Sequence, residues 1–171
     1  NLGFIHINTG AMYRGVALKF IREKIDLNNE SDIKSVLKTT HLTWSGLNFA
    51  NILMDGQDIT LDIVSSKVTR IVSRISAIPE VRNKLVQNQR EIAKDQDVVL
   101  EGRDIGTVVF PEAEYKFFLL ADIHVRAKRR MKQMKSDGEN VSIEEVLFFL
   151  KKRDKQDSSR TYSPLKKAED A

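Results

Sequence analysis

The stretch Val98–Pro111 constrains the fold most, because a short apolar run leads directly into charged residues and glycines. Its first three residues have the composition of a strand that fills the centre of a parallel sheet. Open α/β sheets bind ligands at the carboxyl ends of such strands, so Glu101, Arg103 and Asp104 are predicted to lie at a ligand-binding crevice. A surface turn with a structural ion pair is the alternative, and the spacing alone favours neither interpretation.

The residue types in this loop suit a phosphorylated ligand. Gly102 and Gly106 allow the backbone to turn and to come close to a bound group. The planar guanidinium of Arg103 can hold two phosphate oxygens at once, and the Asp104 carboxylate can accept hydrogen bonds from an amino group.

The amino-terminal part also places a helix directly after a strand. Residues 4–7 are predicted to form the strand, and Asn8-Thr9-Gly10 opens a helix with apolar residues at helical spacing. A helix in this position directs its amide groups into the crevice, where Arg14 would add a full positive charge. Considered alone, Arg14 is better explained as a solvated helix residue.

The middle of the chain changes to short β-like runs. Residues 41–44, 49–54 and 59–61 are separated by Gly-containing turns, which predicts a small antiparallel sheet inserted into an α/β domain. A short helix over 31–37 precedes the sheet, and two helices follow it. Asp62 is predicted to cap the first of these two, and Pro79 to begin the second. The apolar stripe of the first helix is predicted to comprise Ile63, Val64, Val68, Ile71, Val72 and Ile75.

The last third of the chain is predicted to hold a second central strand and two helices. The strand is Tyr115–Leu120, and a helix follows from Asp122. Arg126 and Arg130 are four residues apart on that helix and share a face. Such a basic run is usually a solvated face, and a clamp on polyphosphate is the functional alternative. A capping box at 142–145 opens the last helix, whose buried side is predicted to comprise Val146, Phe149 and Leu150.

Arg153, Asp157 and Arg160 are spaced by four and three residues, so a continuing helix would align them on one face. Asp157 could orient the arginines without a ligand and accept hydrogen bonds from ribose hydroxyls with one, while the arginines neutralise phosphate. Taken alone, this pattern is better explained as a ladder of surface ion pairs.

Composition narrows the class of protein. A chain of 171 residues that is 41% hydrophobic can bury one core of ordinary size. The absence of cysteine excludes disulfides and thiolate metal sites from these residues. A net charge of +4 favours an anionic ligand without requiring nucleic acid. With no apolar run long enough to span a bilayer and no signal-peptide pattern, we expect a cytoplasmic protein that does not engage membranes.

Taken together, four motifs resemble those of the bacterial cytidylate kinases in order and spacing, over nearly the whole chain. The most specific is Gly102-Arg103-Asp104-Ile105-Gly106-Thr107-Val108-Val109-Phe110-Pro111. The others are Thr9-Gly10-Ala11-Met12-Tyr13-Arg14, then Ile78-Pro79-Glu80-Val81-Arg82, and finally Arg153-Asp154 with Asp157 and Arg160 before Ser163-Pro164-Leu165. Their co-occurrence favours the functional interpretation of each motif over the structural one.

The resemblance implies phosphoryl transfer from ATP to CMP or dCMP, with Mg²⁺ accompanying ATP and no metal ligand assigned among these residues. Phosphoryl transfer mainly requires positioning and charge stabilisation, which arginines and a closing lid supply. The implied catalytic residues are Arg103, which would hold the acceptor phosphate with Arg14, and Arg153 and Arg160, which would close over the phosphates. The implied acceptor-site residues are Thr9, Tyr13, Arg14, Ser73, Arg82, Glu101, Asp104 and Asp157, with Ser73, Arg82 and Asp104 at the cytosine edge; Arg126 and Arg130 would serve the ATP side.

The resemblance also implies a fold and a domain plan. The fold is a three-layer α/β architecture like that of the P-loop nucleoside monophosphate kinases, with a parallel sheet flanked by helices. The core would comprise residues 1–34 and 81–171, with a lid around 131–141. Residues 35–80 would form the β-rich insertion that binds the monophosphate.

Three departures from the family pattern stand out. No Gly-x-x-x-x-Gly-Lys-Ser/Thr motif occurs in the 171 residues, so the main cradle for ATP phosphates is missing. We expect that the chain is truncated at this loop and at its carboxyl end, and that it has little kinase activity by itself. Glu101 replaces a frequent aspartate and Thr9 a frequent serine, changes that keep the chemistry and alter the reach.

Other functions remain as alternatives. A UMP-preferring kinase is the nearest, since uracil differs from cytosine at the edge that Arg82 and Asp104 would contact. A nucleotide-binding or RNA-binding module without catalysis is another, and the small basic excess and few aromatic residues make nucleic acid the weaker case. We expect small-molecule nucleotides as the partners, and a monomer.

Overall fold

The computed structural model describes residues 3–46, 49–136 and 138–171. In chain order the elements are β1 (Ile5–Asn8), α1 (Thr9–Arg22), α2 (Glu30–Thr39), β2 (Leu42–Ser45), β3 (Asn51–Met54), β4 (Gln57–Asp58), the short helix η2 (Asp62–Val64), α3 (Ser66–Ile75), α4 (Pro79–Ile92), β5 (Val98–Glu101), the π-helical turn η3 (Ile105–Val109), α5 (Ile123–Ser136) and α6 (Ile143–Ser158).

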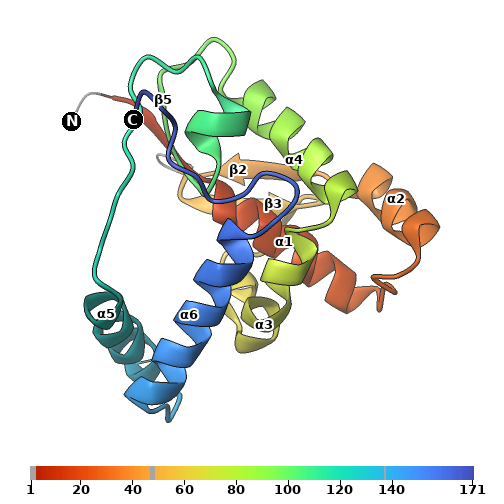
Figure 1. Ribbon diagram of the computed structural model, residues 1–171. Helices are drawn as coiled ribbons and strands as arrows, with labels where there is room; N and C mark the ends of the chain where they lie inside the picture. Colours follow the sequence, from red (N-terminus) through yellow and green to blue (C-terminus); the bar gives the residue numbers. More distant parts are fainter. Residues whose placement is uncertain (1–2, 47–48, 137) are drawn as a thin grey trace.

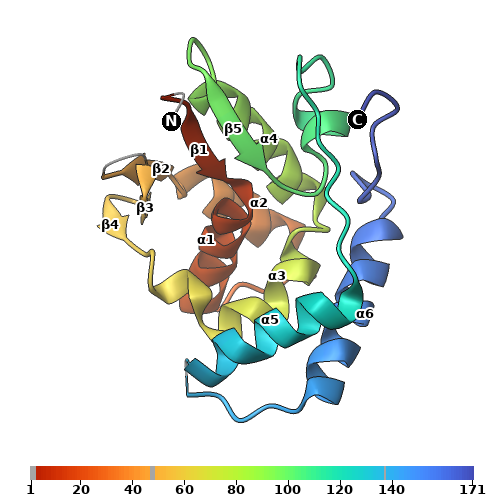
Figure 2. The ribbon, with the colours of Figure 1, turned by 90° about the vertical axis from the view of Figure 1, so that its left-hand side faces the viewer.

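The parallel sheet pairs β1 with β5, which lie side by side in Figure 2. Their register pairs Ile7 with Leu100 and Asn8 with Glu101, so both strands end at the same edge. This arrangement confirms the predicted α/β class. Val99 is half exposed, however, because the described sheet has only two strands and part of its surface stays uncovered. The prediction that β5 is a buried central strand is therefore wrong for this residue.

Helix α1 runs through the middle of the molecule (Figure 1) and contacts α3, α4, β3 and β5. Met12, Val16 and Ala17 are fully buried, as their spacing predicted. Gly15 allows β2 (Leu42–Ser45) to come close to α1, because a Cβ at this position would lie 3.0 Å from Leu42 Cδ2. One hydrophobic core therefore joins the two halves of the predicted domain plan, and the division itself remains a prediction.

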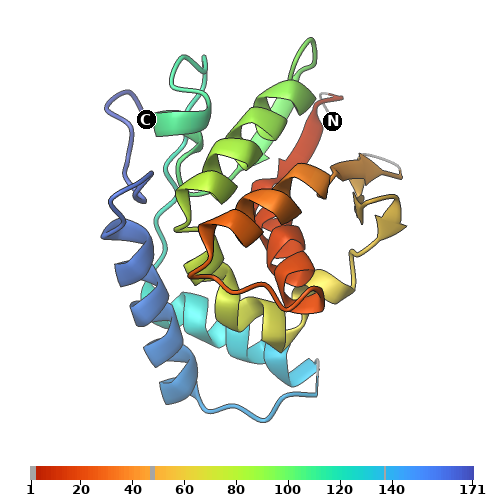
Figure 3. The ribbon, with the colours of Figure 1, turned by 90° about the vertical axis from the view of Figure 1, so that its right-hand side faces the viewer.

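The antiparallel sheet forms with the order β2–β3–β4, which confirms the predicted β-rich part. Its last strand is Gln57–Asp58 rather than the predicted 59–61, although the Ile59 amide still donates a hydrogen bond of 3.0 Å to the Ile52 carbonyl and the Ile59 side chain is buried in the core. Helix α2 begins at Glu30 and ends at Thr39, longer than predicted, and it packs against α4 (Figure 3).

The start of α3 also differs from its prediction. Asp62 begins η2 and pairs with Arg22, while Ser65 is the residue that precedes α3. Val64 is 61% exposed since it lies in η2, outside the periodicity of α3. Pro79 begins α4 as predicted.

The predicted strand Tyr115–Leu120 does not form, and its large side chains are mostly exposed. An extended segment becomes a strand only when a neighbouring strand accepts and donates its backbone hydrogen bonds. No strand lies beside this segment in the described part of the chain. The expectation of a second central strand is therefore wrong for this structure.

Helices α5 and α6 form a hairpin at one end of the molecule (Figure 2). The predicted capping box forms, with reciprocal hydrogen bonds between Ser142 and Glu145. Val146 is buried, but Phe149 is 61% exposed and makes an edge-to-face contact with Phe148. The predicted buried side of α6 is therefore wrong at Phe149, because the hairpin packs only α5 and a short part of α3 against α6.

The lid predicted around 131–141 includes Asp137, which lies outside the described residues, as do residues 1–2 and 47–48. Gly138 adopts a φ of +82°, a conformation that favours glycine and fits a turn. Among the described helices none is both long and apolar enough to cross a membrane.

Candidate active site

The edge where β1 and β5 end positions the first group of predicted residues. Thr9 is buried at the start of α1, and its hydroxyl donates a hydrogen bond of 2.7 Å to the carbonyl of Glu101. Gly102 is required beside it, because a Cβ there would lie 2.6 Å from Thr9 Oγ1. The Glu101 side chain instead points to solvent, 3.8 Å from His6 Nε2.

Three arginines converge on the carboxylate of Asp157, which is 1% exposed. Arg103, from the loop after β5, places Nε 3.0 Å from Asp157 Oδ2, and Arg153 of α6 places its Nε 3.8 Å from the same oxygen. Arg160 pairs with Oδ1. Helix α6 ends at Ser158, so Arg160 reaches Asp157 from beyond the helix, whereas the prediction had it on a continuing helix. We call Arg103, Arg153, Asp157 and Arg160 the arginine cluster.

The arginine cluster carries more positive than negative charge. Burial and the neighbouring Arg103 hold the pKa of Arg153 below its usual range. Arg14 extends the cluster: burial, followed by repulsion from Arg153 and Arg130, lowers its pKa to about 10. An electrostatic environment that disfavours its own cations favours an anionic ligand.

Arg14 is held by α3 and η2. Its Nη1 donates to Thr69 Oγ1 at 2.9 Å and to the Ile63 carbonyl at 3.2 Å. Helix α3 and η2 therefore fix the position of a charged side chain that belongs to α1.

A second group of site residues contains an ion pair that is almost fully enclosed. Arg82 of α4 and Asp104 are 3% and 5% exposed and form an ion pair through Arg82 Nη2 and Asp104 Oδ2. Arg82 Nη1 also donates to the Ser76 carbonyl at 2.9 Å, and its guanidinium carbon lies 5.3 Å from the centre of the Tyr13 ring. We call Arg82 and Asp104 the buried pair, and Tyr13 its aromatic support.

Consecutive residues of the loop join the two groups. Arg103 binds Asp157 of the arginine cluster, and Asp104 binds Arg82 of the buried pair. The loop is itself held by Arg90, which donates to the carbonyls of Val108 and Val109 at 2.8 and 2.9 Å. Residues predicted from separate motifs are thus brought to one region of the molecule.

The remaining predicted residues lie at the margin of this region. Arg126 forms two hydrogen bonds with Asp154, at 2.7 and 3.2 Å, and this contact raises its pKa. Arg130 donates to Gln133 on its own helix, yet is close enough to affect Arg14. Ser73 lies half-buried on α3.

Several residues of this region were not predicted. Asp154 neutralises Arg126, Gln89 is buried at 1% exposure beside Tyr13, Arg90 fixes the loop, and Thr69 holds Arg14. Asp154 follows Arg153 in one of the quoted motifs, and Gln89 lies seven residues after Arg82 on one helix face, whereas no pattern in the sequence indicated Arg90 or Thr69.

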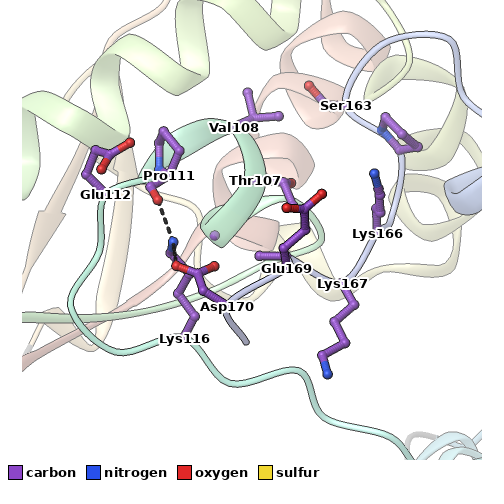
Figure 4. A pocket seen from close by; sticks show the side chains of 13 residues that line it. Thr107, Val108, Pro111, Glu112, Lys116, Ser163, Lys166, Lys167, Glu169 and Asp170 are labelled. Carbon is purple, nitrogen blue, oxygen red and sulfur yellow. Dashed lines mark hydrogen bonds and ion pairs between the residues drawn. The ribbon is translucent and has the colours of Figure 1, made fainter.

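A cavity of about 610 Å³ lies next to the same loop (Figure 4), between its residues 106–116 and the carboxyl-terminal residues 163–170. The ammonium group of Lys116 donates to the Pro111 carbonyl and pairs with Asp170 at its wall. As the structure describes it, none of the predicted site residues lines this cavity.

The described residues contain no group of three or more His, Cys, Asp or Glu side chains that could hold a metal ion. The carboxylates nearest the site, Asp157 and Asp104, are engaged by arginines. These residues therefore do not fit a metal centre of their own, and we assign them no metal.

The α/β fold, with its parallel strand pair and its antiparallel three-stranded sheet, is that of the nucleoside monophosphate kinases. A family model described as "Cytidylate kinase" matches residues 1–171. The chain belongs to the cytidylate kinase family.

Individual relatives agree with this assignment. The chain is 46% identical over 164 residues to a cytidylate kinase of Caldanaerobacter subterraneus subsp. tengcongensis, covering 96% of this chain and 72% of that protein. It is 45% identical over 170 residues to that of Desulforamulus reducens, covering 99% and 77%. It is 44% identical over 171 residues to that of Carboxydothermus hydrogenoformans, covering 99% and 77%.

Proposed function

We propose that the arginine cluster and the buried pair form one acceptor site for CMP, to which a phosphoryl group is transferred from ATP. The observation that carries this proposal is the pairing of consecutive residues, Arg103 with Asp157 and Asp104 with Arg82. A phosphate and a nucleobase joined by a ribose need two such groups at a fixed separation.

In the reaction, an oxygen of the CMP phosphate forms a bond to the γ-phosphorus of ATP while the bond from that phosphorus to the β–γ bridging oxygen breaks, giving CDP and ADP. Arg14 and Arg103 bind the acceptor phosphate. Arg153 and Arg160 leave Asp157 in part and stabilise the charge of the transferring group, since arginines aimed at developing charge lower the barrier. Asp157, once freed, accepts hydrogen bonds from the sugar hydroxyls.

The base is discriminated at the buried pair. Arg82 holds Asp104 so that its carboxylate can accept a hydrogen bond from the amino group of cytosine, and Ser73 supplies a further polar contact. Uracil presents a carbonyl oxygen where cytosine presents the amino group, so an acceptor at this position disfavours it. Thr9 and Glu101 shape the floor of the site through their own hydrogen bond.

Arg126 and Arg130 serve the donor side, where Mg²⁺ would accompany ATP and offset the charge of its phosphates. The 171 residues contain no phosphate-binding loop motif, so we propose that they bind CMP but do not transfer phosphate efficiently by themselves. Full activity would then need a longer chain that carries the loop, here called the full-length kinase. Calorimetry with CMP and a kinase assay, both on the 171-residue chain, test this: binding with negligible turnover is expected, and rapid turnover would contradict it.

A coupled assay of the full-length kinase with CMP, dCMP and UMP tests the substrate. We expect CMP and dCMP to be phosphorylated with a higher kcat/KM than UMP. If UMP reacts as well as CMP, the base assignment is wrong, and a UMP-preferring kinase becomes the better description.

A further inference from the structure

The support behind Arg82 is the part of the site whose role is still unassigned. Tyr13 is buried, and its ring faces the Arg82 guanidinium, whose carbon lies 5.3 Å from the ring centre. Gln89, 1% exposed on α4, lies beside the Tyr13 hydroxyl, although the two groups do not form a hydrogen bond of good geometry. Tyr13 is therefore placed to act on Arg82, and Gln89 to pack beside Tyr13.

Arg82 needs this support because its hydrogen bonds do not fix it completely. Nη1 binds the Ser76 carbonyl and Nη2 binds Asp104, while Nε is buried and has no hydrogen-bond partner in the described part of the chain. The hydrogen bonds at Nη1 and Nη2 hold the outer end of the guanidinium, whereas no hydrogen bond holds its Nε edge. The Tyr13 ring, 5.3 Å away, supplies the missing constraint through a cation–π contact in a desolvated site.

We infer that Tyr13 is a positioning residue for base discrimination: its ring supports Arg82 on the side that lacks a hydrogen bond, and Arg82 fixes Asp104. This inference rests on the proposed function, in which Asp104 contacts the cytosine amino group. Tyr13 thus acts behind the acceptor site, whereas the sequence suggested that it shapes the pocket directly.

Steady-state kinetics of the full-length kinase with CMP and UMP test the inference. Tyr13→Leu removes the ring, and we expect the ratio of kcat/KM for CMP over UMP to fall roughly 10-fold, the scale of a buried cation–π contact. The fall should come from a higher KM for CMP, with kcat changed less than about 3-fold, because a contact made equally in the ground and transition states affects KM. Tyr13→Phe keeps the ring and should restore the ratio.

Gln89→Leu provides a second variant, which keeps the ring but changes the buried packing beside it, and a smaller loss of about 3-fold is expected. It decides the question if Tyr13→Leu does not fold. Tyr115→Leu, at an exposed tyrosine, is the matched control and should keep the wild-type ratio.

The outcomes separate the two claims. A wild-type kinase without preference for CMP refutes the proposed function. A wild-type kinase that prefers CMP, with the ratio unchanged in Tyr13→Leu and Gln89→Leu, overturns the inference alone. Equal losses toward both nucleotides show a purely structural role and overturn it too.

Discussion

The two arginine groups of the site differ in how their charge is balanced. In the buried pair, one arginine meets one carboxylate, and both are almost fully enclosed. In the arginine cluster, three arginines share one carboxylate, and Arg103 and Arg153 keep about 40% of their side chains exposed. The difference indicates two roles. The neutralised buried pair provides a fixed geometry, and the arginine cluster provides excess positive charge for an anionic ligand.

Breaking the buried pair should have the largest effect on stability. Asp104→Asn leaves the Arg82 charge buried without a counter-ion, and a loss of about 3–5 kcal/mol in the free energy of unfolding is expected. Urea unfolding measures it. Asp62→Asn, which breaks the exposed pair with Arg22, is the matched control and should cost less than about 1 kcal/mol. Equal losses in the two variants would contradict the distinction.

Removing an arginine from the cluster should affect turnover instead. Arg103→Ala takes away a charge aimed at the acceptor phosphate, and kcat of the full-length kinase should fall by about 100-fold or more. Arg22→Ala removes a surface arginine and should leave kcat unchanged. A near-normal rate for Arg103→Ala would exclude this residue from the site.

Ionisation of Tyr13, the aromatic support of the buried pair, should make the free energy of unfolding depend on pH. Burial raises the pKa of Tyr13 from 10.0 to about 12, so the neutral form stabilises the fold below pH 10, and this contribution is lost as the pH rises to 12. Over that range Tyr13→Phe should lose about 2–3 kcal/mol less stability than the wild type. The comparison between the two proteins cancels the opposite trend from Arg14, whose pKa is lowered to about 10. Parallel urea-unfolding curves against pH would contradict the prediction.

The smallest expected effect is on the Tm of a variant at Arg153, where the arginine cluster should contribute to turnover but not to stability. Arg153→Met removes a partly exposed cation whose pKa is lowered by burial and by Arg103, so the Tm of the free protein should stay the same or rise slightly. The same change should reduce turnover of the full-length kinase and weaken stabilisation by inorganic phosphate. Calorimetric scans with and without phosphate measure both, and a lower Tm in the absence of phosphate would show that Arg153 is held favourably.

Elements with local signals were predictable from the sequence. The start of α1 after Asn8, Pro79 at the start of α4, and the Ser142–Glu145 capping box follow from short-range hydrogen bonds and fixed backbone angles. The segment Tyr115–Leu120 has strand composition, but a strand depends on a neighbour that composition does not reveal.

The same distinction applies to the site. Spacing along the chain predicted that Arg153, Asp157 and Arg160 lie together. The pairing of Arg126 with Asp154 joins residues of two helices, and the stacking of Tyr13 on Arg82 joins α1 to α4. Such contacts arise from the packing of separate helices, which the local spacing of residues in the sequence does not reveal.

The most direct test of the account is calorimetric binding of CMP, cytidine and UMP to the full-length kinase. Cytidine lacks the phosphate that the arginine cluster should hold, and UMP lacks the amino group that Asp104 should recognise. The account predicts that CMP binds at least about 10-fold more tightly than either, one such factor being worth about 1.4 kcal/mol. Cytidine or UMP binding as tightly as CMP would contradict the claim that the two groups form one acceptor site.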